Sequence, residues 1–272
     1  MRGKVLKSLF LGLVLLFLYL PILVLAVYSF TDATSLGRLG GFTLKNYINL
    51  FTIDELRQMI VGTLLLAFLV ATLSMILGTL GALGSFYSKE RTTRAITFMN
   101  QVPVVNADVV TGFSITILLV IVMQVSKDTF IPLIIGHVTL CTPFVYLSVM
   151  PKIRQMDSSQ YEAALDLGAK PFGALRDIVL PQIAPGIASG FALALTLSLD
   201  DYFVATYTKP ATFDTISTYV VNATRGSQTT IKTALWALST VIFAVVVLTV
   251  LLMNLRGRRS GKEEESYREE SN

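Results

Sequence analysis

The sequence predicts an all-α integral membrane protein with six transmembrane helices. Of its 272 residues 53% are hydrophobic and only 15% are charged, and the mean hydropathy is +0.65, whereas a soluble domain carries about a quarter charged residues. Several apolar runs reach the ~20 residues that a helix needs to cross the hydrocarbon core. Backbone amides in lipid must be bonded within the chain, so these runs are expected to be helices.

The apolar segments lie at about 8–30, 59–88, 102–125, 130–150, 183–207 and 234–255. The first resembles a secretory signal, but its apolar run is long and no clear A-x-A site follows, so we expect an uncleaved helix. Small residues in the second and fifth spans predict close helix packing. Pro132 and Pro143 lack an amide hydrogen and are expected to bend or interrupt the fourth span.

The distribution of basic residues predicts the orientation of the chain. The N-terminus, the second and fourth connecting segments and the C-terminus hold fifteen Lys and Arg, and the alternate segments hold seven. By the positive-inside rule, both termini and the fourth segment are cytoplasmic in a multi-pass protein of the cell (inner) membrane. Residues 1–255 are then one membrane domain with an insert at 151–182, and residues 256–272 form a charged cytoplasmic tail.

The sequence gives weak support for a nucleic-acid partner, a disulfide or a metal site. The basic residues flank apolar spans and form no single patch, so we expect a lipid bilayer and no nucleic acid as the partner. One cysteine, Cys141, leaves no intramolecular disulfide and too few thiols for a metal site. The single histidine, His137, is interpreted as a packing residue, and we expect no bound metal.

The polar insert between the fourth and fifth spans is expected to form two short helices joined at a glycine. Ser158 or Ser159 can cap the first helix, and Gly168 can end it in the left-handed conformation. Lys170-Pro171 would then open a second helix that ends near Leu180-Pro181. A cap, a hinge and two apolar faces are typical of a docking element and unnecessary in a flexible connector.

The insert resembles a known family. Glu162-Ala163-Ala164, three residues, Gly168, nine residues and Ile178-x-Leu180-Pro181 are similar to the full EAA signature of membrane subunits of ATP-binding-cassette importers. In that family the segment is the coupling helix that fits a cleft on the ATP-hydrolysing subunit. The resemblance assigns the coupling role to Tyr161, Glu162, Ala163, Ala164, Asp166, Gly168, Ala169, Leu180 and Pro181.

The resemblance covers almost the whole chain. The runs 103–110, 137–144 and 197–201 look like the second permease subunit of spermidine/putrescine importers, although Asn106-Ala107-Asp108 stands where that family has Ser-Pro-Asp. It implies a type I importer permease that has no catalytic residue and binds no cofactor, with ATP and Mg in a partner ATPase dimer. The other implied partners are a second homologous permease subunit and an extracytoplasmic polyamine-binding protein.

Three acids in the spans are a second candidate site. A carboxylate near mid-membrane costs roughly 2.5 to 3.5 kcal/mol, and no Lys or Arg lies within the six predicted spans to offset it. Asp108, Asp200 and Asp201 could therefore line the path of a cation, or could only cap helices and contact neighbouring subunits. Spans entering at 102 and 183 would place Asp108 about 9 Å and Asp200 about 26 Å deep, at opposite ends of that path.

Aromatic residues near these acids could contact an ammonium group through their ring faces, although aromatics are also common at membrane interfaces. Adjacent helical residues point about 100° apart, so Asp200 and Asp201 cannot both face one point. The predicted substrate path comprises Asp108, Asp200, Asp201, Tyr202 and Tyr207.

Two other classes and a different cargo compete with a polyamine permease. An intramembrane aspartyl protease needs carboxylates on facing helices, whereas Asp200 and Asp201 are adjacent and lack the Gly-x-Gly-Asp context. A secondary transporter commonly shows inverted repeats and would not need the insert. The docking signature is shared by importers of other small solutes, so another cargo stays open.

Overall fold

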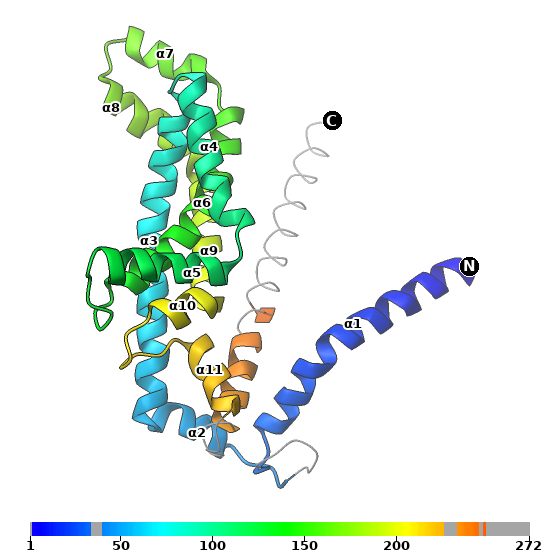
Figure 1. The fold of residues 1–272 in the computed structure, drawn as a ribbon. Helices are drawn as coiled ribbons and strands as arrows, with labels where there is room; N and C mark the ends of the chain where they lie inside the picture. Colours follow the sequence, from blue (N-terminus) through cyan, green and yellow to red (C-terminus); the bar gives the residue numbers. More distant parts are fainter. Residues whose placement is uncertain (1, 34–39, 226–232, 245–246, 249–272) are drawn as a thin grey trace. The chain divides into compact units, whose positions relative to one another are not determined.

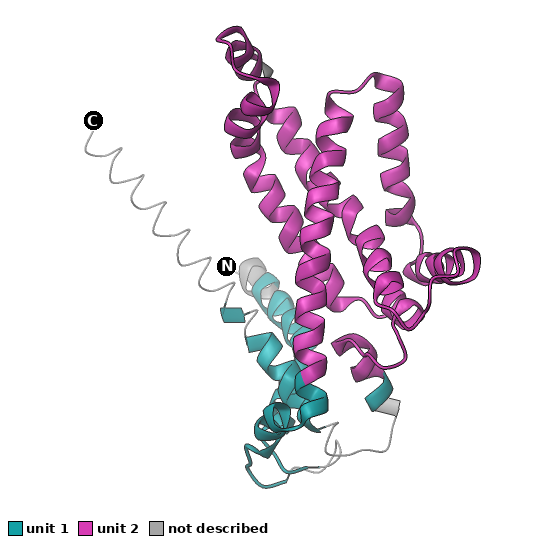
Figure 2. Cartoon of the chain, turned by 90° about the vertical axis from the view of Figure 1, so that its left-hand side faces the viewer, with its two compact units in different colours: residues 1–57, 222–272 teal, residues 58–221 magenta. Residues whose placement is uncertain are grey.

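The computed structural model describes residues 2–33, 40–225, 233–244 and 247–248, and this part of the chain is mainly helical (Figure 1). Its one β feature among the described residues is an isolated antiparallel bridge between Thr31 and Phe42. The chain divides into two compact units, 1–57 with 222–272, and 58–221 (Figure 2). Each unit is described separately below.

The first unit contains α1 (Arg2–Ser29), α2 (Lys45–Thr52) and the apolar helix Thr233–Ala244. The buried Asn46 amide donates to the carbonyls of Ser29 at 3.0 Å and Thr31 at 2.9 Å, which joins α2 to the end of α1. The rings of Tyr28 and Trp236 lie 5.7 Å apart. The predicted sixth span is described in part, and its remaining residues lie outside the described ranges.

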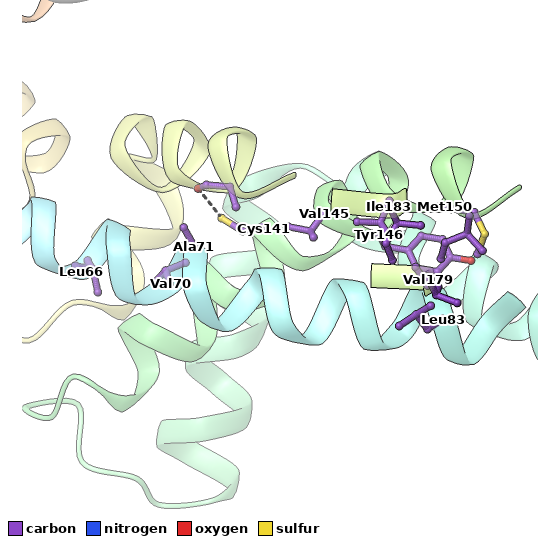
Figure 3. Packing of buried hydrophobic residues seen from close by; sticks show 14 of the residues in the cluster. Leu66, Val70, Ala71, Leu83, Cys141, Val145, Tyr146, Met150, Val179 and Ile183 are labelled. Carbon is purple, nitrogen blue, oxygen red and sulfur yellow. Dashed lines mark hydrogen bonds between the residues drawn. The ribbon is translucent and has the colours of Figure 1, made fainter. Parts of the chain in front are cut away.

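The second unit is built on α6 (Ile131–Gln155), which packs between α9 (Leu180–Asp200) and much of α3 (Asp54–Phe86) (Figure 3). Glycine permits this close approach. A Cβ atom at Gly78 of α3 would lie 2.7 Å from Val145 Cβ, and one at Gly190 of α9 would lie 3.0 Å from Val145 Cγ1. The predicted close packing of small residues is confirmed at Gly78 and Gly190, whereas a Cβ atom at Gly84 would meet nothing within 4 Å.

Four helices in the described residues are long and apolar enough to cross a membrane: Lys7–Ser29, Asp54–Phe86, Ile131–Gln155 and Pro171–Asp200. A fifth span would be formed by α4 (Glu90–Val105) with α5 (Asp108–Thr116) and its π-helical extension Ile117–Val122, which together bend by 107°. The all-α membrane fold is confirmed, and the described residues account for up to five of the six predicted spans.

The prediction of a straight third span at 102–125 is wrong. The helix begins at Glu90 and turns at Asn106 and Ala107, whose ψ angles of 146° and 136° are extended. The Asn106 side chain donates to Thr111 Oγ1 at 3.1 Å, which secures the turn. The hydropathy pattern concealed this start because no residue of α4 is buried and its sequence mixes polar with apolar residues.

Two other helix boundaries also differ from the prediction. The helix opened by Pro171 does not end near Pro181: α8 (Pro171–Ala174) continues through the π-helical segment Leu175–Val179 into α9. The fifth span is not one helix to 207, because α9 ends at Asp200 and the short α10 (Phe203–Thr208) follows. A further helix, α11 (Ile216–Arg225), comes after α10.

The prolines of the fourth span do not interrupt it. Pro132 occupies the first turn of α6, where the missing amide hydrogen has no intrahelical partner to lose. Pro143 lies inside the same continuous helix and is buried. Packing on both sides of α6 therefore outweighs the local preference of Pro143 to break it.

Candidate functional site

The polar insert begins with a capped helix, α7 (Ser158–Asp166). The prediction of Ser158 or Ser159 as its cap is wrong, because the Asp157 carboxylate accepts the backbone N–H of Ser159 at 3.0 Å. Hydrogen bonds from the side chain and backbone of Ser159 lower the pKa of Asp157 below its usual value, since they favour the charged carboxylate.

Gly168 ends α7, as the sequence predicts. The Ala169 N–H donates to the Ala164 carbonyl at 3.0 Å and the Gly168 N–H to the Leu165 carbonyl at 2.9 Å, which is the Schellman pattern. The φ angle of Gly168 is +89°, and a Cβ atom there would meet nothing within 4 Å. Glycine is therefore required by the backbone conformation of this turn and not by a lack of space.

The turn at Gly168 presents apolar side chains to the outside. Leu167 is 90% exposed and Phe172 is 75% exposed. Neither residue belongs to the coupling set that the resemblance assigns, and Leu167 is the C-cap residue of α7. Four members of the coupling set are also exposed around this turn: Glu162, Ala163, Asp166 and Ala169.

The remaining coupling residues join the insert to the helices. Tyr161 packs against the buried cluster, and its ring lies 5.7 Å from that of Tyr87. Leu180 packs against the same cluster, and Pro181 is exposed in the first turn of α9. The predicted coupling set thus divides into an exposed group near Gly168 and a group that attaches the insert.

The second candidate site lies at the break between α9 and α10. The Asp201 carboxylate accepts the backbone N–H groups of Val204 at 3.2 Å and Ala205 at 2.7 Å, and the residue is 8% exposed. Its Oδ2 atom is 3.5 Å from Nε2 of the buried His137. The His137 Nδ1 atom lies 2.9 Å from the Leu133 carbonyl oxygen. His137 is therefore more than a packing residue.

The other two acids are exposed. Asp108 begins α5, the helix against which α10 packs. The prediction that Asp108 and Asp200 stand at opposite ends of a path is wrong, because Asp108 follows the whole of α4. The 16 residues of that helix rise by about 24 Å, which is comparable to the length of α9 before Asp200.

The predicted aromatic residues flank this break. The Tyr202 and Phe203 rings are 5.2 Å apart, and the Tyr207 and Phe113 rings are 5.9 Å apart. Thr116 Oγ1 donates to the Tyr207 carbonyl at 3.1 Å, which ties α10 to α5. Among the described residues, no three His, Cys, Asp or Glu side chains gather as a metal site would require.

The described residues thus combine helices that are long and apolar enough to cross a membrane with an exposed, capped insert. Residues 74–259 match the family described as "Binding-protein-dependent transport system inner membrane component", and the chain belongs to this family. The predicted resemblance to importer permeases is thereby confirmed.

Curated relatives match most of the chain. The spermidine/putrescine transport system permease protein PotC of Haemophilus influenzae is 31% identical over 248 residues, which cover 91% of this chain and 96% of the relative. The putrescine transport system permease protein PotI of Escherichia coli is 33% identical over 214 residues, 77% of this chain and 76% of the relative.

A solved structure shares the fold. A chain of a bacterial ABC transporter involved in the import of the acidic polysaccharide alginate superposes with a TM-score of 0.70 at 15% sequence identity. The match covers 93% of this chain and 96% of that chain. A second structure of a bacterial alginate ABC transporter, in complex with a periplasmic protein, gives a TM-score of 0.70 at 20% identity. The importer permease architecture is confirmed.

Proposed function

We propose that this permease subunit translocates polyamines in an ATP-driven importer. The observation that carries the proposal is the 31% identity over 96% of a spermidine/putrescine permease. A putrescine permease that is 33% identical supports the same cargo class. Polyamines carry several ammonium groups, so their path through lipid requires acceptors that offset positive charge.

The two exposed acids suit such a path. Asp108 is exposed at the start of α5 and Asp200 is exposed at the end of α9, and neither helix contains Lys or Arg. Each can accept hydrogen bonds from an ammonium group, and such charge-assisted bonds are stronger than neutral ones. Tyr202 and Tyr207 are half-buried beside the acids and could contact the same cation through their rings.

Coupling to ATP hydrolysis is assigned to the exposed insert. The turn at Gly168 presents Leu167 and Phe172 as apolar side chains that a cleft on an ATPase subunit could bury. Glu162 and Asp166 are exposed nearby and could contact basic groups at the edge of such a cleft. Tyr161 and Leu180 would hold this surface in place.

The complete importer needs further chains. A dimer of ATPase subunits would hold ATP and Mg, a second homologous permease would supply the other half of the pathway, and an extracytoplasmic binding protein would deliver the polyamine. This chain would bind no cofactor and carry out no hydrolysis. Both termini and the insert would be cytoplasmic, which is supported by fifteen Lys and Arg on that side against seven on the other.

Uptake of labelled spermidine and putrescine by the reconstituted complex tests the cargo and the acidic path together. Asp108→Asn and Asp200→Asn each remove a charge-assisted hydrogen bond worth about 1.5 to 3 kcal/mol, so uptake should fall by roughly ten- to a hundredfold. Asp128→Asn is the matched control, since it removes an exposed carboxylate from the loop before α6.

The outcomes separate the two parts of the proposal. An unmodified complex that imports neither polyamine would show that the cargo is another solute. Polyamine uptake that stays unchanged in both Asp108→Asn and Asp200→Asn would exclude the acidic path while keeping the cargo.

A further inference from the structure

We propose that Asp201 is a positioning residue that works with His137 to fix α10, and that it does not contact the cargo. The inference deepens the proposed function and rests on it, because it assigns different roles to two adjacent acids of the path. Asp200 would face the cation, and Asp201 would hold the element beside it.

The oxygens of Asp201 already have partners inside the protein. Oδ1 accepts the Val204 N–H at 3.2 Å, and Oδ2 accepts the Ala205 N–H at 2.7 Å. Val204 and Ala205 lie in the first turn of α10, where amides have no intrahelical partners, so the carboxylate acts as a cap one residue before the N-cap position. With 8% of the residue exposed, little of Asp201 is left for a cation in the path.

The proton count of the pair removes the net charge of Asp201. His137 Nδ1 lies 2.9 Å from a carbonyl oxygen, which only accepts, so we assign a proton to Nδ1. Nε2 then faces Asp201 Oδ2 at 3.5 Å. Two lone pairs facing each other in a buried site would repel, which favours one further proton on the pair. Whichever atom holds it, the pair is neutral overall and attracts an ammonium group only weakly.

The packing of α10 explains why its N-terminus must be fixed. Val204 lies between two glycines: a Cβ atom at Gly112 of α5 would be 2.9 Å from Val204 Cα, and one at Gly136 of α6 would be 2.8 Å from Val204 Cγ1. The far end is tied by the bond from Thr116 to the Tyr207 carbonyl. A shift of Asp201 would therefore displace α10 from both neighbouring helices.

This arrangement links the pair to the path residues. Asp200 immediately precedes the break, Tyr202 and Tyr207 flank α10, and Asp108 begins the helix against which α10 packs. Loss of the cap would leave the backbone N–H groups of Val204 and Ala205 without their acceptor, and loss of the imidazole would leave the buried carboxylate of Asp201 without its neighbour. The exposed carboxylates would then lose their fixed spacing, although both would still be present.

Two readouts in the assembled complex test the positioning role. Uptake of labelled spermidine reports the path, and maleimide labelling of Thr206→Cys, in a Cys141→Ser background that removes the single native cysteine, reports the position of α10 without any cargo. Thr206 is exposed on α10, and its hydroxyl donates to the carbonyl of Tyr202 at 2.6 Å within the same turn.

The variants differ in what they preserve. Asn at 201 can donate to His137 Nε2 and accept one backbone N–H, but it loses the acceptor of the other, so Asp201→Asn should lower uptake and raise the labelling rate by less than Asp201→Ala does. Asp201→Ala and His137→Leu leave buried polar groups unpaired, and should raise the labelling rate and lower uptake by about tenfold or more each. Asp200→Asn should lower uptake by a similar factor with unchanged labelling.

The inference is overturned if Asp201→Asn abolishes uptake as Asp200→Asn does, because the charge of Asp201 would then serve the cargo. It is equally overturned if Asp201→Ala and His137→Leu label like the unmodified protein. Co-purification of each variant with the ATPase subunits shows that the chain has folded. If no polyamine is imported at all, the proposed cargo fails, while the labelling rates still decide the role of Asp201.

Discussion

Gly168 shows how one residue can control the surface that a partner would recognise. Its positive φ costs other L-residues roughly 1 to 2 kcal/mol, so Gly168→Ala should distort the Schellman turn and misplace Leu167. We expect polyamine uptake to fall while the complex still hydrolyses ATP, since the docked surface would no longer follow the ATPase. Parallel assays of uptake and phosphate release measure this uncoupling.

Gly173→Ala is the matched control for that experiment. Gly173 lies on α8 beyond the same turn, its φ is not positive, and a Cβ atom there meets nothing within 4 Å. Equal loss of uptake in both variants would mean that the effect is not due to the left-handed conformation at Gly168.

The cap of α7 gives a pH dependence at the residue scale. The pKa of Asp157 is lowered in the folded state, so its ionised carboxylate stabilises the capped helix. This stabilisation is fully present above the unfolded pKa and is lost as the pH falls through the folded pKa. Exchange of the Ser159 amide hydrogen should therefore accelerate, after correction for intrinsic rates, only below the ordinary range of an aspartate. Asp157→Asn should show no such transition.

At the scale of elements, the packing of α10 predicts that two glycines differ in their tolerance of a methyl group. Gly112→Ala would press on the Val204 backbone, whereas Gly136→Ala would press on a Val204 methyl group that can move slightly. Overpacking costs typically about 1 to 3 kcal/mol. We expect Gly112→Ala to lower the thermal stability of the purified complex more than Gly136→Ala does.

Gly84→Ala on α3 provides the control, since a Cβ atom there meets nothing within 4 Å. If Gly112→Ala melts at the same temperature as Gly84→Ala, the close packing of α10 against α5 is not present in the protein.

The elements also show which features a sequence can predict. The stop at Gly168 and the helix opened at Pro171 depend on local chemistry and could be predicted. The start of α4 at Glu90 could not, because α4 buries none of its residues and shows no continuous apolar run. Its bend at Asn106 lacks the proline that the family pattern places next in the chain, where this sequence has Ala107.

The acid site shows the same limit. Asp108, Asp200 and Asp201 could be selected because carboxylates are costly in lipid, but their relation depends on helices that pack at a distance in sequence. His137 is 64 positions from Asp201 and joins it only because α6 packs against α10. No spacing within either segment predicts that pair.

At the scale of the whole molecule, the orientation in the membrane can be tested directly. Phe172→Cys in the Cys141→Ser background places a thiol on the exposed insert, which the positive-inside rule puts in the cytoplasm. An impermeant maleimide should label it in inside-out vesicles and not in right-side-out ones. Asp128→Cys, in an alternate segment, should show the opposite pattern, and reversed labelling of the two sites would invert the topology.

The continuous helical run from Pro171 to Asp200 has a mechanical consequence. Its 30 residues rise by about 45 Å, and they begin beside the exposed turn and end at the acid. A continuous helix changes little in length, so it tilts as one body. A partner that tilted the turn at Gly168 would therefore move Asp200 as well.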